Sequence, residues 1–195
     1  MPRPGLIPPD TWPSDGEIVL RLRREADAAA IALASHDPET RRRLNDAPQA
    51  GGGGLDGVKR AEEQWSAGTG APFVIADASD DRPLGLLNLQ FGDDEGVASL
   101  AVSVFPEARG RGIAPRALRL GAVWGLRELG LARVAAEAAI DNHASIRAIE
   151  KAGFVREGIL RAHCQTNGAR HDCAMFSLVA SDLQPPRDDS SGRRR

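Results

Sequence analysis

A glycine-rich turn in the middle of the chain has the residue types that bind phosphate. It contains Arg109, Gly110, Arg111, Gly112 and Ala114. It follows an alternating apolar stretch, residues 100–104, that predicts a strand, and it precedes a long helical pattern. The first N–H groups of a helix have no partner within the helix, and the helix dipole adds positive charge there. Because the glycines let the backbone approach an anion, the turn predicts a phosphate cradle to which both arginines add charge.

The residues beside the two glycines exclude the common nucleotide-binding motifs. A P-loop requires Gly-Lys followed by Ser or Thr, whereas Ile113 and Ala114 stand at those positions. A dinucleotide-binding turn requires a third glycine, and that position is Pro115. What remains is an Arg-x-x-Gly-x-Ala pattern from Arg109 to Ala114. The alternative is a glycine-rich turn that only connects a strand to a helix. The rest of the sequence must distinguish this alternative from a phosphate site.

A second stretch with chemical potential begins at Asn142 and includes Ser145. Asn142 suits the N-cap of a short helix that ends before Gly153, which is a structural explanation for its presence. Ser145 and Ile149 are four residues apart and so share one face of that helix. A small residue packed on a helix face is the structural explanation for Ser145.

Together the two stretches resemble the GNAT acetyltransferases. The second one matches the Asn-x-x-Ser … Glu-Lys-x-Gly-Phe-x-x-Glu-Gly signature of the ribosomal-protein N-terminal acetyltransferase branch, the RimJ/RimL type. The similarity covers roughly residues 84–178, and more loosely the chain from residue 18. The resemblance implies an α/β (α+β) fold, a seven-strand mixed and splayed sheet flanked by helices, with a C-terminal β-hairpin.

The resemblance also implies a co-substrate, acetyl-CoA, and where it binds. Backbone groups around Val102 and Val104 would bind the pantetheine arm, and the turn from Arg109 to Ala114 would hold the pyrophosphate. Asn142 would orient the cofactor near its thioester. No metal is expected in this chemistry.

The proton donor and the base are less settled. The chain has no tyrosine, and the tyrosine usual in the family would fall at Ile149. In this branch a serine near the CoA sulfur is implied to assist thiolate departure, here Ser145, and a water relay is an equal alternative. An α-amine with a pKa near ~8 needs only a weak base. The candidate bases are Glu95, Asp94, His143 and His163.

The remaining elements are predicted from periodicity and turn residues. Strands are expected at residues 17–23, 73–76, 84–91, 97–104, 132–139, 154–162 and 170–179. Helices are expected at residues 25–35, 38–44, 56–67, 114–129 and 142–152. Residues 51–54, all glycine, are interpreted as a connector.

The last two strands are predicted to form a hairpin around Asn167-Gly168. In that register His163 faces Asp172, and Cys164 faces His171. The two cysteines, Cys164 and Cys173, do not form a disulfide framework of the secreted type. Because the Cys and His spacing is not that of a zinc finger, a polar hairpin beside the cleft is favoured over a metal site or a cysteine nucleophile.

Length and composition fit one acetyltransferase-sized domain. We expect an irregular arm at residues 1–15, a domain at 16–181 and a disordered tail at 182–195. The net charge of −2 argues against a nucleic-acid partner, and no apolar run long enough for a membrane span is present. With no apolar signal core at the N-terminus, a cytoplasmic protein is expected. A homodimer is left open.

The sequence thus predicts an enzyme, an N-acetyltransferase that moves an acetyl group from acetyl-CoA to a primary amine by direct attack in a ternary complex. A protein N-terminal α-amine is the favoured acceptor. One alternative is a small amine such as an antibiotic or a polyamine. A second alternative is a CoA-binding sensor or interaction protein without turnover.

Overall fold

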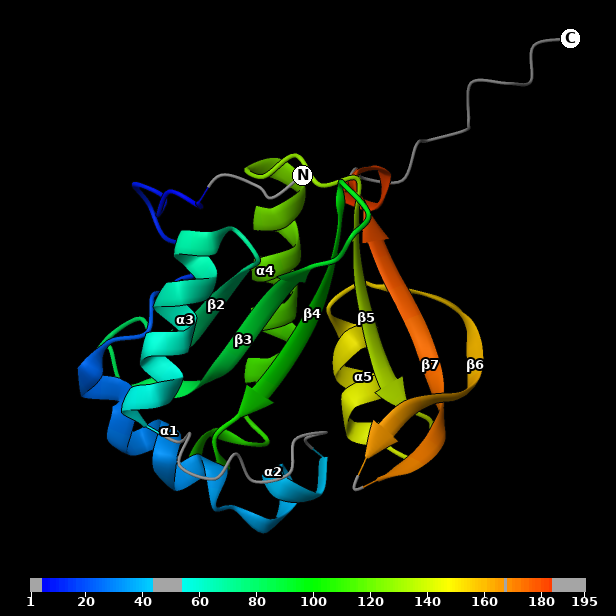
Figure 1. The fold of residues 1–195 in the computed structure, drawn as a ribbon, viewed down its shortest axis with the longest axis horizontal. Coiled ribbons are helices and arrows are strands. Elements are labelled where there is room, and N and C mark those ends of the chain that lie inside the picture. The colour runs from blue at the N-terminus through cyan, green and yellow to red at the C-terminus, as the bar shows by residue number, and fades with distance from the viewer. Residues whose placement is uncertain (1–4, 44–53, 167, 184–195) are drawn as a thin grey trace, which may run out of the picture.

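The computed structural model describes residues 5–43, 54–166 and 168–183 (Figure 1). Its centre is a seven-stranded sheet with the order β1-β2-β3-β4-β5-β7-β6. The strands are β1 Ile18–Arg21, β2 Gly70–Asp77, β3 Pro83–Phe91, β4 Val97–Val104, β5 Arg133–Ala139, β6 Val155–Thr166 and β7 Ala169–Val179. Every neighbouring pair is antiparallel except β4 and β5, which are parallel. The predicted mixed seven-strand sheet is confirmed.

Five α-helices accompany this sheet in the described residues. They are α1 Ala28–Ser35, α2 Pro38–Arg43, α3 Leu55–Ala67, α4 Ile113–Arg127 and α5 His143–Lys151, with 3₁₀ turns at Glu25–Asp27, Pro106–Ala108 and Ala180–Leu183. The helix expected over residues 25–35 starts as a 3₁₀ turn, because the Asp27 carboxylate accepts from the backbone N–H of Arg24. None of the described helices is both long and apolar enough to cross a membrane.

The two parallel strands separate after a short pairing. β4 and β5 pair over four positions, from Val97 with Arg133 to Leu100 with Ala136. Beyond them the strands diverge toward their C-terminal ends (Figure 1). The crossover between them is α4, as the strand–helix–strand order predicts. The divergence exposes the ends of both strands, which is where a sheet of this type binds ligands.

Helix α4 packs unusually close to the sheet. Its apolar stripe buries Leu118 and Ala122 in the main core. At Gly121 a Cβ would lie 2.5 Å from Leu87 Cδ2 on β3, so a larger residue there would require the Leu87 side chain or the helix to shift. The close packing fixes where the N-terminal end of α4 meets the sheet.

The C-terminal hairpin departs from the predicted register. Cys164 faces His171 as expected, but Leu160 already faces Cys173, so three residues of β6 oppose Asp172 alone. This bulge makes the His163–Asp172 pairing wrong. The Asp172 carboxylate instead accepts from the N–H of Ala162 at 2.9 Å, and Ala162 has a φ of +51°. Because pairing resumes after the bulge, β6 continues to Thr166 and does not end at Ala162.

The two cysteines form a disulfide between β6 and β7, which the sequence did not predict. At the C-terminal side, the Asp182 carboxylate accepts from the N–H of Val179, so the first residues of the expected tail belong to a 3₁₀ turn. Residues 184–195 of that tail, residues 1–4 of the arm, Leu44, glycines 51–53 and Asn167 lie outside the described residues.

Candidate active site

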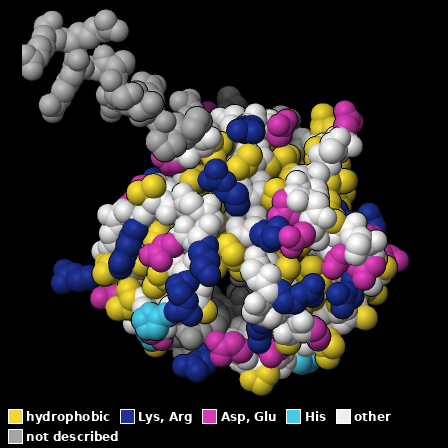
Figure 2. All heavy atoms as spheres, turned by 180° about the vertical axis from the view of Figure 1, so that it is seen from behind, with side chains coloured by type: hydrophobic (Ala, Val, Ile, Leu, Met, Phe, Trp, Pro, Cys, Tyr) yellow, Lys and Arg dark blue, Asp and Glu magenta, His cyan; other side chains and the backbone are white. Residues whose placement is uncertain are grey.

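A cavity of about 1000 Å³ lies where β4 and β5 diverge. It is lined by residues 101–104 of β4, residues 137–139 of β5, the turn before α4, one face of α5 and part of the β6–β7 hairpin. Figure 2 shows the surface hollowed below its centre, with basic side chains beside the hollow. Both stretches singled out from the sequence therefore contribute to one cavity.

The glycine-rich turn has the backbone conformation that an anion cradle needs. Gly110 and Gly112 have φ values of +74° and +75°, and Gly112 is the N-cap of α4. A Cβ at either glycine would meet no atom within 4 Å. Glycine is therefore required by the left-handed backbone and not by crowding. Both glycines, Ile113 and Ala114 line the cavity, so the N-terminus of α4 opens into it.

Arg109 lines the cavity, and its side chain also makes hydrogen bonds to neighbouring segments, so its predicted role at the pyrophosphate stays a prediction. Arg109 donates from Nη2 to Asp37 Oδ2 at 2.5 Å and to Thr40 Oγ1 at 2.8 Å, and from Nε to the carbonyl of Val104 at 3.3 Å. These bonds lower the pKa of Asp37 to about 2, the hydrogen bond from Arg109 being the largest cause. Arg109 thus attaches the turn to α2. Arg111 is exposed and is not among the residues that line the cavity.

The end of β4 supplies an edge of backbone to the cavity. Val102 and Val104 both line it, and they pair on their other side with Leu87 and Gly85 of β3. On the β5 side the pairing stops at Leu100. Peptide groups on that side of residues 101–104 therefore face the cavity and not a strand.

Helix α5 presents Asn142, Ser145 and Ile149 to the same cavity. The Asn142 side chain accepts from the N–H of Ser145 at 3.2 Å, so the N-cap predicted for it is present. Ile149 is buried, and Ser145 lies one turn before it on the same face.

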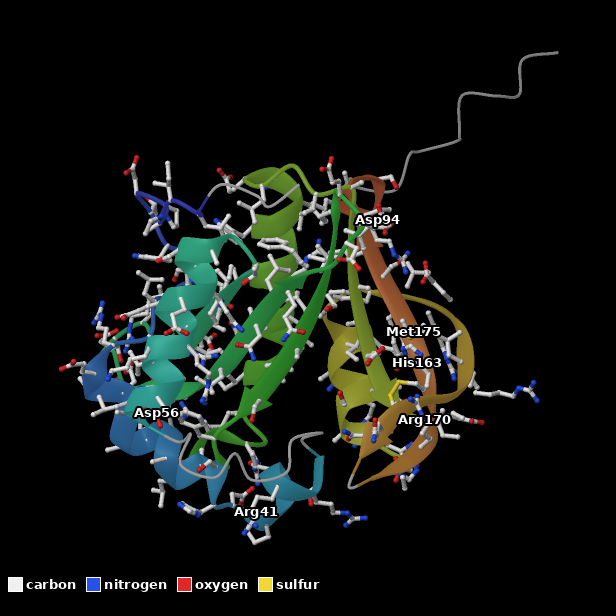
Figure 3. The ribbon with its side chains drawn as sticks, viewed as in Figure 1. Arg41, Asp56, Asp94, His163, Arg170 and Met175 are labelled. Carbon is white, nitrogen blue, oxygen red and sulfur yellow. A yellow bond between two sulfur atoms is a disulfide. The ribbon has the colours of Figure 1, made fainter. Side chains whose placement is uncertain are left out.

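The structure changes the set of candidate bases. Glu95 lies in the turn before β4, at the opposite end of that strand from the cavity, and does not line it. Its neighbour Asp94 is labelled in Figure 3, far from His163. His143 is exposed and outside the lining.

Glu137 is a cavity-lining carboxylate that sequence reasoning missed. It lies on β5, and its Oε2 is 3.2 Å from Nε2 of His163. Because the flanking residues are alanines, the sequence pattern predicts only a strand at residues 132–139 and assigns no role to Glu137. The available signal was a single charged residue in an otherwise apolar run, on the face opposite to buried Ala136 and Ala138.

Glu157, a residue of the sequence signature, links three strands through hydrogen bonds. Its carboxylate accepts two hydrogen bonds from Arg133 at 2.5 Å and one from Ser177 at 2.8 Å. These bonds, with Arg133 the largest cause, lower the pKa of Glu157 to about 2. The carboxylate therefore joins β6 to β5 and β7.

The mixed sheet splays open, and the glycine-capped N-terminus of α4 lies at the opening between β4 and β5. These features define the class of fold, which is the acyltransferase fold that the sequence predicts. The family model described as the acetyltransferase (GNAT) domain matches residues 17–155, and the chain belongs to this family. The resemblance drawn from the two motifs is confirmed.

Individual relatives agree with this assignment. The chain is 34% identical over 82 residues to the uncharacterized N-acetyltransferase YoaA and 35% identical over 113 residues to the probable N-acetyltransferase YjcK, both from Bacillus subtilis. These alignments cover 42% and 56% of the chain, but only 46% and 62% of the two relatives.

Solved structures share the fold over most of the chain. Ribosomal-protein-S5-alanine acetyltransferase from Vibrio fischeri has a TM-score of 0.76 at 21% identity, covering 90% of this chain and 100% of its own. Spermidine N-acetyltransferase from Vibrio cholerae, solved with CoA and spermine, has a TM-score of 0.74 at 19% identity, covering 86% and 98%.

Proposed function

We propose that the protein transfers an acetyl group from acetyl-CoA to a primary amine, with a protein N-terminal α-amine as the favoured acceptor. One observation carries the proposal. The N-terminus of α4, the Ser145 face of α5 and Glu137 all line one cavity between the diverging strands β4 and β5. An anion site, a hydroxyl and a proton acceptor are thereby within reach of one bound thioester.

Acetyl-CoA fits this cavity in one direction. The pyrophosphate binds the first N–H groups of α4, where Gly110 and Gly112 keep side chains away from it. The pantetheine arm then follows the free edge of β4 beside Val102 and Val104. The thioester ends near Asn142 and Ser145, which line the same cavity.

The two reactants enter from opposite faces of the sheet. Ile149 of α5 belongs to the same core cluster as Ala136 and Ala138, whereas Glu137 projects from the other face of β5. An amine approaching on the Glu137 side therefore meets a thioester held on the α5 side. Such an arrangement supports direct attack in a ternary complex, which gains from orienting both reactants.

The reaction then needs one proton acceptor and one proton donor. Glu137 accepts a proton from the ammonium form of the acceptor, directly or through His163 or a water. The neutral nitrogen attacks the thioester carbon, and backbone N–H groups at the end of β4 stabilise the oxyanion. The C–S bond breaks, and the thiolate of CoA leaves with a hydrogen bond or a proton from Ser145, or with a proton from water.

The cavity has acidic and basic lining residues. Glu137 and Asp141 lie at the β5–α5 side, whereas Glu39, Arg42 and Arg109 lie at the side of α2 and the glycine-rich turn. Both a peptide N-terminus and a polyamine carry positive charge, and relatives of the same fold are described for each. A small amine is therefore the second candidate, and CoA binding without turnover is the third.

Transfer assays with a panel of acceptors test the proposal. The panel contains a peptide with a free N-terminus, the same peptide with a blocked N-terminus, spermidine and an aminoglycoside. We expect acetyl-CoA-dependent product with the free peptide and none with the blocked one, by mass spectrometry. Product only with spermidine or the aminoglycoside would move the acceptor to the small-amine class. Tight acetyl-CoA binding with no product from any amine would favour the non-catalytic alternative.

A further inference from the structure

Three neighbouring strands bring metal-binding side chains together on one face of the sheet. Ala139 of β5 faces Cys173 of β7, so Glu137, two residues earlier, points to the same face as Cys173. Cys164 of β6 faces His171, two residues before Cys173, and therefore shares this face as well. A carboxylate oxygen of Glu137 and the two Sγ atoms all lie within 4.8 Å of one another. The disulfide is visible beside His163 in Figure 3.

The bulge in β6 adds an imidazole to this cluster. Three residues of β6 oppose Asp172, and Ala162 takes a positive φ within them. The bulge is held by Asp172, which accepts from the N–H of Ala162, and by Arg170, which donates to the carbonyls of Ala162 and His163. With this backbone, His163 reaches across β7 to within 3.2 Å of Glu137. Bulges of this kind redirect side chains next to functional sites.

We propose that the dithiol form of this hairpin is a zinc site, with Cys164, Cys173 and Glu137 as ligands and His163 as the fourth. Two thiolates, one imidazole and one carboxylate are all ordinary zinc ligands, and four of them complete a tetrahedral site. With metal–ligand distances of about 2.0–2.3 Å, tetrahedral ligand atoms lie roughly 3.3–3.8 Å apart. The carboxylate oxygen and the two sulfurs already lie within 4.8 Å of one another. The His163 ring is not part of that group, and it must turn toward the sulfurs from its place 3.2 Å from Glu137.

Zinc binding requires that the disulfide is reduced first. A dithiol reductant supplies two electrons and two protons, the S–S bond breaks to give two thiols, and the reductant becomes a disulfide. Zinc then displaces the thiol protons and binds the two thiolates. The oxidised form keeps both sulfurs in the S–S bond and has no thiolate to offer.

Zinc binding and acetyl transfer would compete for Glu137. A carboxylate coordinated to zinc is not free to accept a proton from the amine, so the reduced, zinc-loaded protein is expected to transfer acetyl more slowly. The site itself uses none of the residues assigned to acetyl-CoA binding. Its existence therefore does not depend on the acetyl-transfer proposal.

Metal titration of the full chain in both redox states tests the site. The protein is reduced with a dithiol, freed of reductant by anaerobic gel filtration, and titrated with Co²⁺ and then Zn²⁺. We expect one Co²⁺ per reduced chain, with a thiolate-to-cobalt charge-transfer band and the intense d–d bands of a tetrahedral site, both lost on adding Zn²⁺. The oxidised chain should show neither band.

Variants identify the ligands. Cys164→Ser should abolish the charge-transfer spectrum, and Glu137→Gln or His163→Ala should weaken zinc affinity by about tenfold or more, as loss of metal-site partners commonly does. His36→Ala, an exposed histidine at the end of α1, is the matched control and should bind zinc unchanged. Circular dichroism verifies that each reduced variant is folded.

Two results would overturn the proposal. One is a reduced chain, folded or unfolded, that binds no stoichiometric Co²⁺ or Zn²⁺. The other is stoichiometric binding that survives both Cys164→Ser and Glu137→Gln. Either result leaves acetyl transfer by the oxidised chain as it was, so failure of the zinc site and failure of the proposed activity are distinguishable.

Discussion

His163 Nε2 lies 3.2 Å from Glu137 Oε2, although 26 residues separate them in the chain. The contact exists because β6 bulges before Cys164 and turns His163 toward β5. It places an imidazole against a carboxylate that lines the cavity. In the proposed function, this exposed pair is the route by which a proton taken from the amine reaches solvent.

Replacing Glu137 by Gln should lower kcat by about 10²–10⁴-fold, the range typical of a lost general base. The size and shape of the side chain are kept, so acetyl-CoA affinity should change little. Steady-state rates and calorimetry measure the two quantities. Glu95→Gln is the control, because Glu95 lies at the other end of β4. Equal rates for Glu137→Gln and wild type would show that solvent removes the proton.

Gly112→Asp should weaken acetyl-CoA binding by about tenfold or more, which is ~1.4 kcal/mol. The substitution places a carboxylate at the N-cap of α4, against the pyrophosphate, and strains a φ of +75°. Gly130→Asp is the matched control. Gly130 has a φ of +65° and open space around it but follows the other end of α4. Calorimetry measures the acetyl-CoA affinity of the two folded variants. Equal affinities would show that the pyrophosphate does not bind at this turn.

Ser145→Ala should reduce kcat by about 10²-fold while acetyl-CoA affinity stays nearly intact, since one transition-state hydrogen bond is lost. Rapid-quench kinetics, in which chemistry is the slow step, measure the effect. In the Ser145→Ala background, Ile149→Tyr should restore part of the rate if the ring is accommodated, because Ile149 is buried one turn along the same face. Full turnover by Ser145→Ala would mean that the thiolate leaves with water alone.

Glu157→Gln should remove an acid-sensitive part of the stability. Hydrogen bonds from Arg133 and Ser177 lower the pKa of Glu157 to about 2, below its ordinary 4.5. A carboxyl whose pKa is lower in the folded state stabilises the protein fully above its unfolded pKa and loses this effect as pH falls toward the folded value. The contribution therefore disappears between about pH 4.5 and pH 2.

Urea unfolding at pH 7 and at pH 2.5 measures this contribution. The wild type should lose more stability between the two pH values than Glu157→Gln does. Asp93→Asn, in an exposed turn, is the control and should follow the wild type. An identical pH dependence for wild type and Glu157→Gln would contradict the role assigned to the Arg133 contact.

The sequence by itself determined the local features of this protein. The α4 cradle is encoded by two glycines in left-handed conformation before a periodic helix, and the N-cap of α5 is encoded by Asn142. The positions of the strands along the chain, the parallel crossover and the register at Cys164 likewise follow from alternation and turn residues. All of these depend on interactions between residues close in the chain or on a repeating pattern.

The tertiary structure decided which side chains those elements place together. Arg109, which lines the cavity, also binds Asp37, the residue before α2, and Glu137 lines the cavity because β4 and β5 separate after four pairs. The bulge that turns His163 toward Glu137 also displaces it from Asp172. Such contacts depend on the angle between strands and on the two extra residues that β6 has in its ladder with β7. Sequence periodicity contains no information about these features, so it does not predict which residues distant in the chain contact one another.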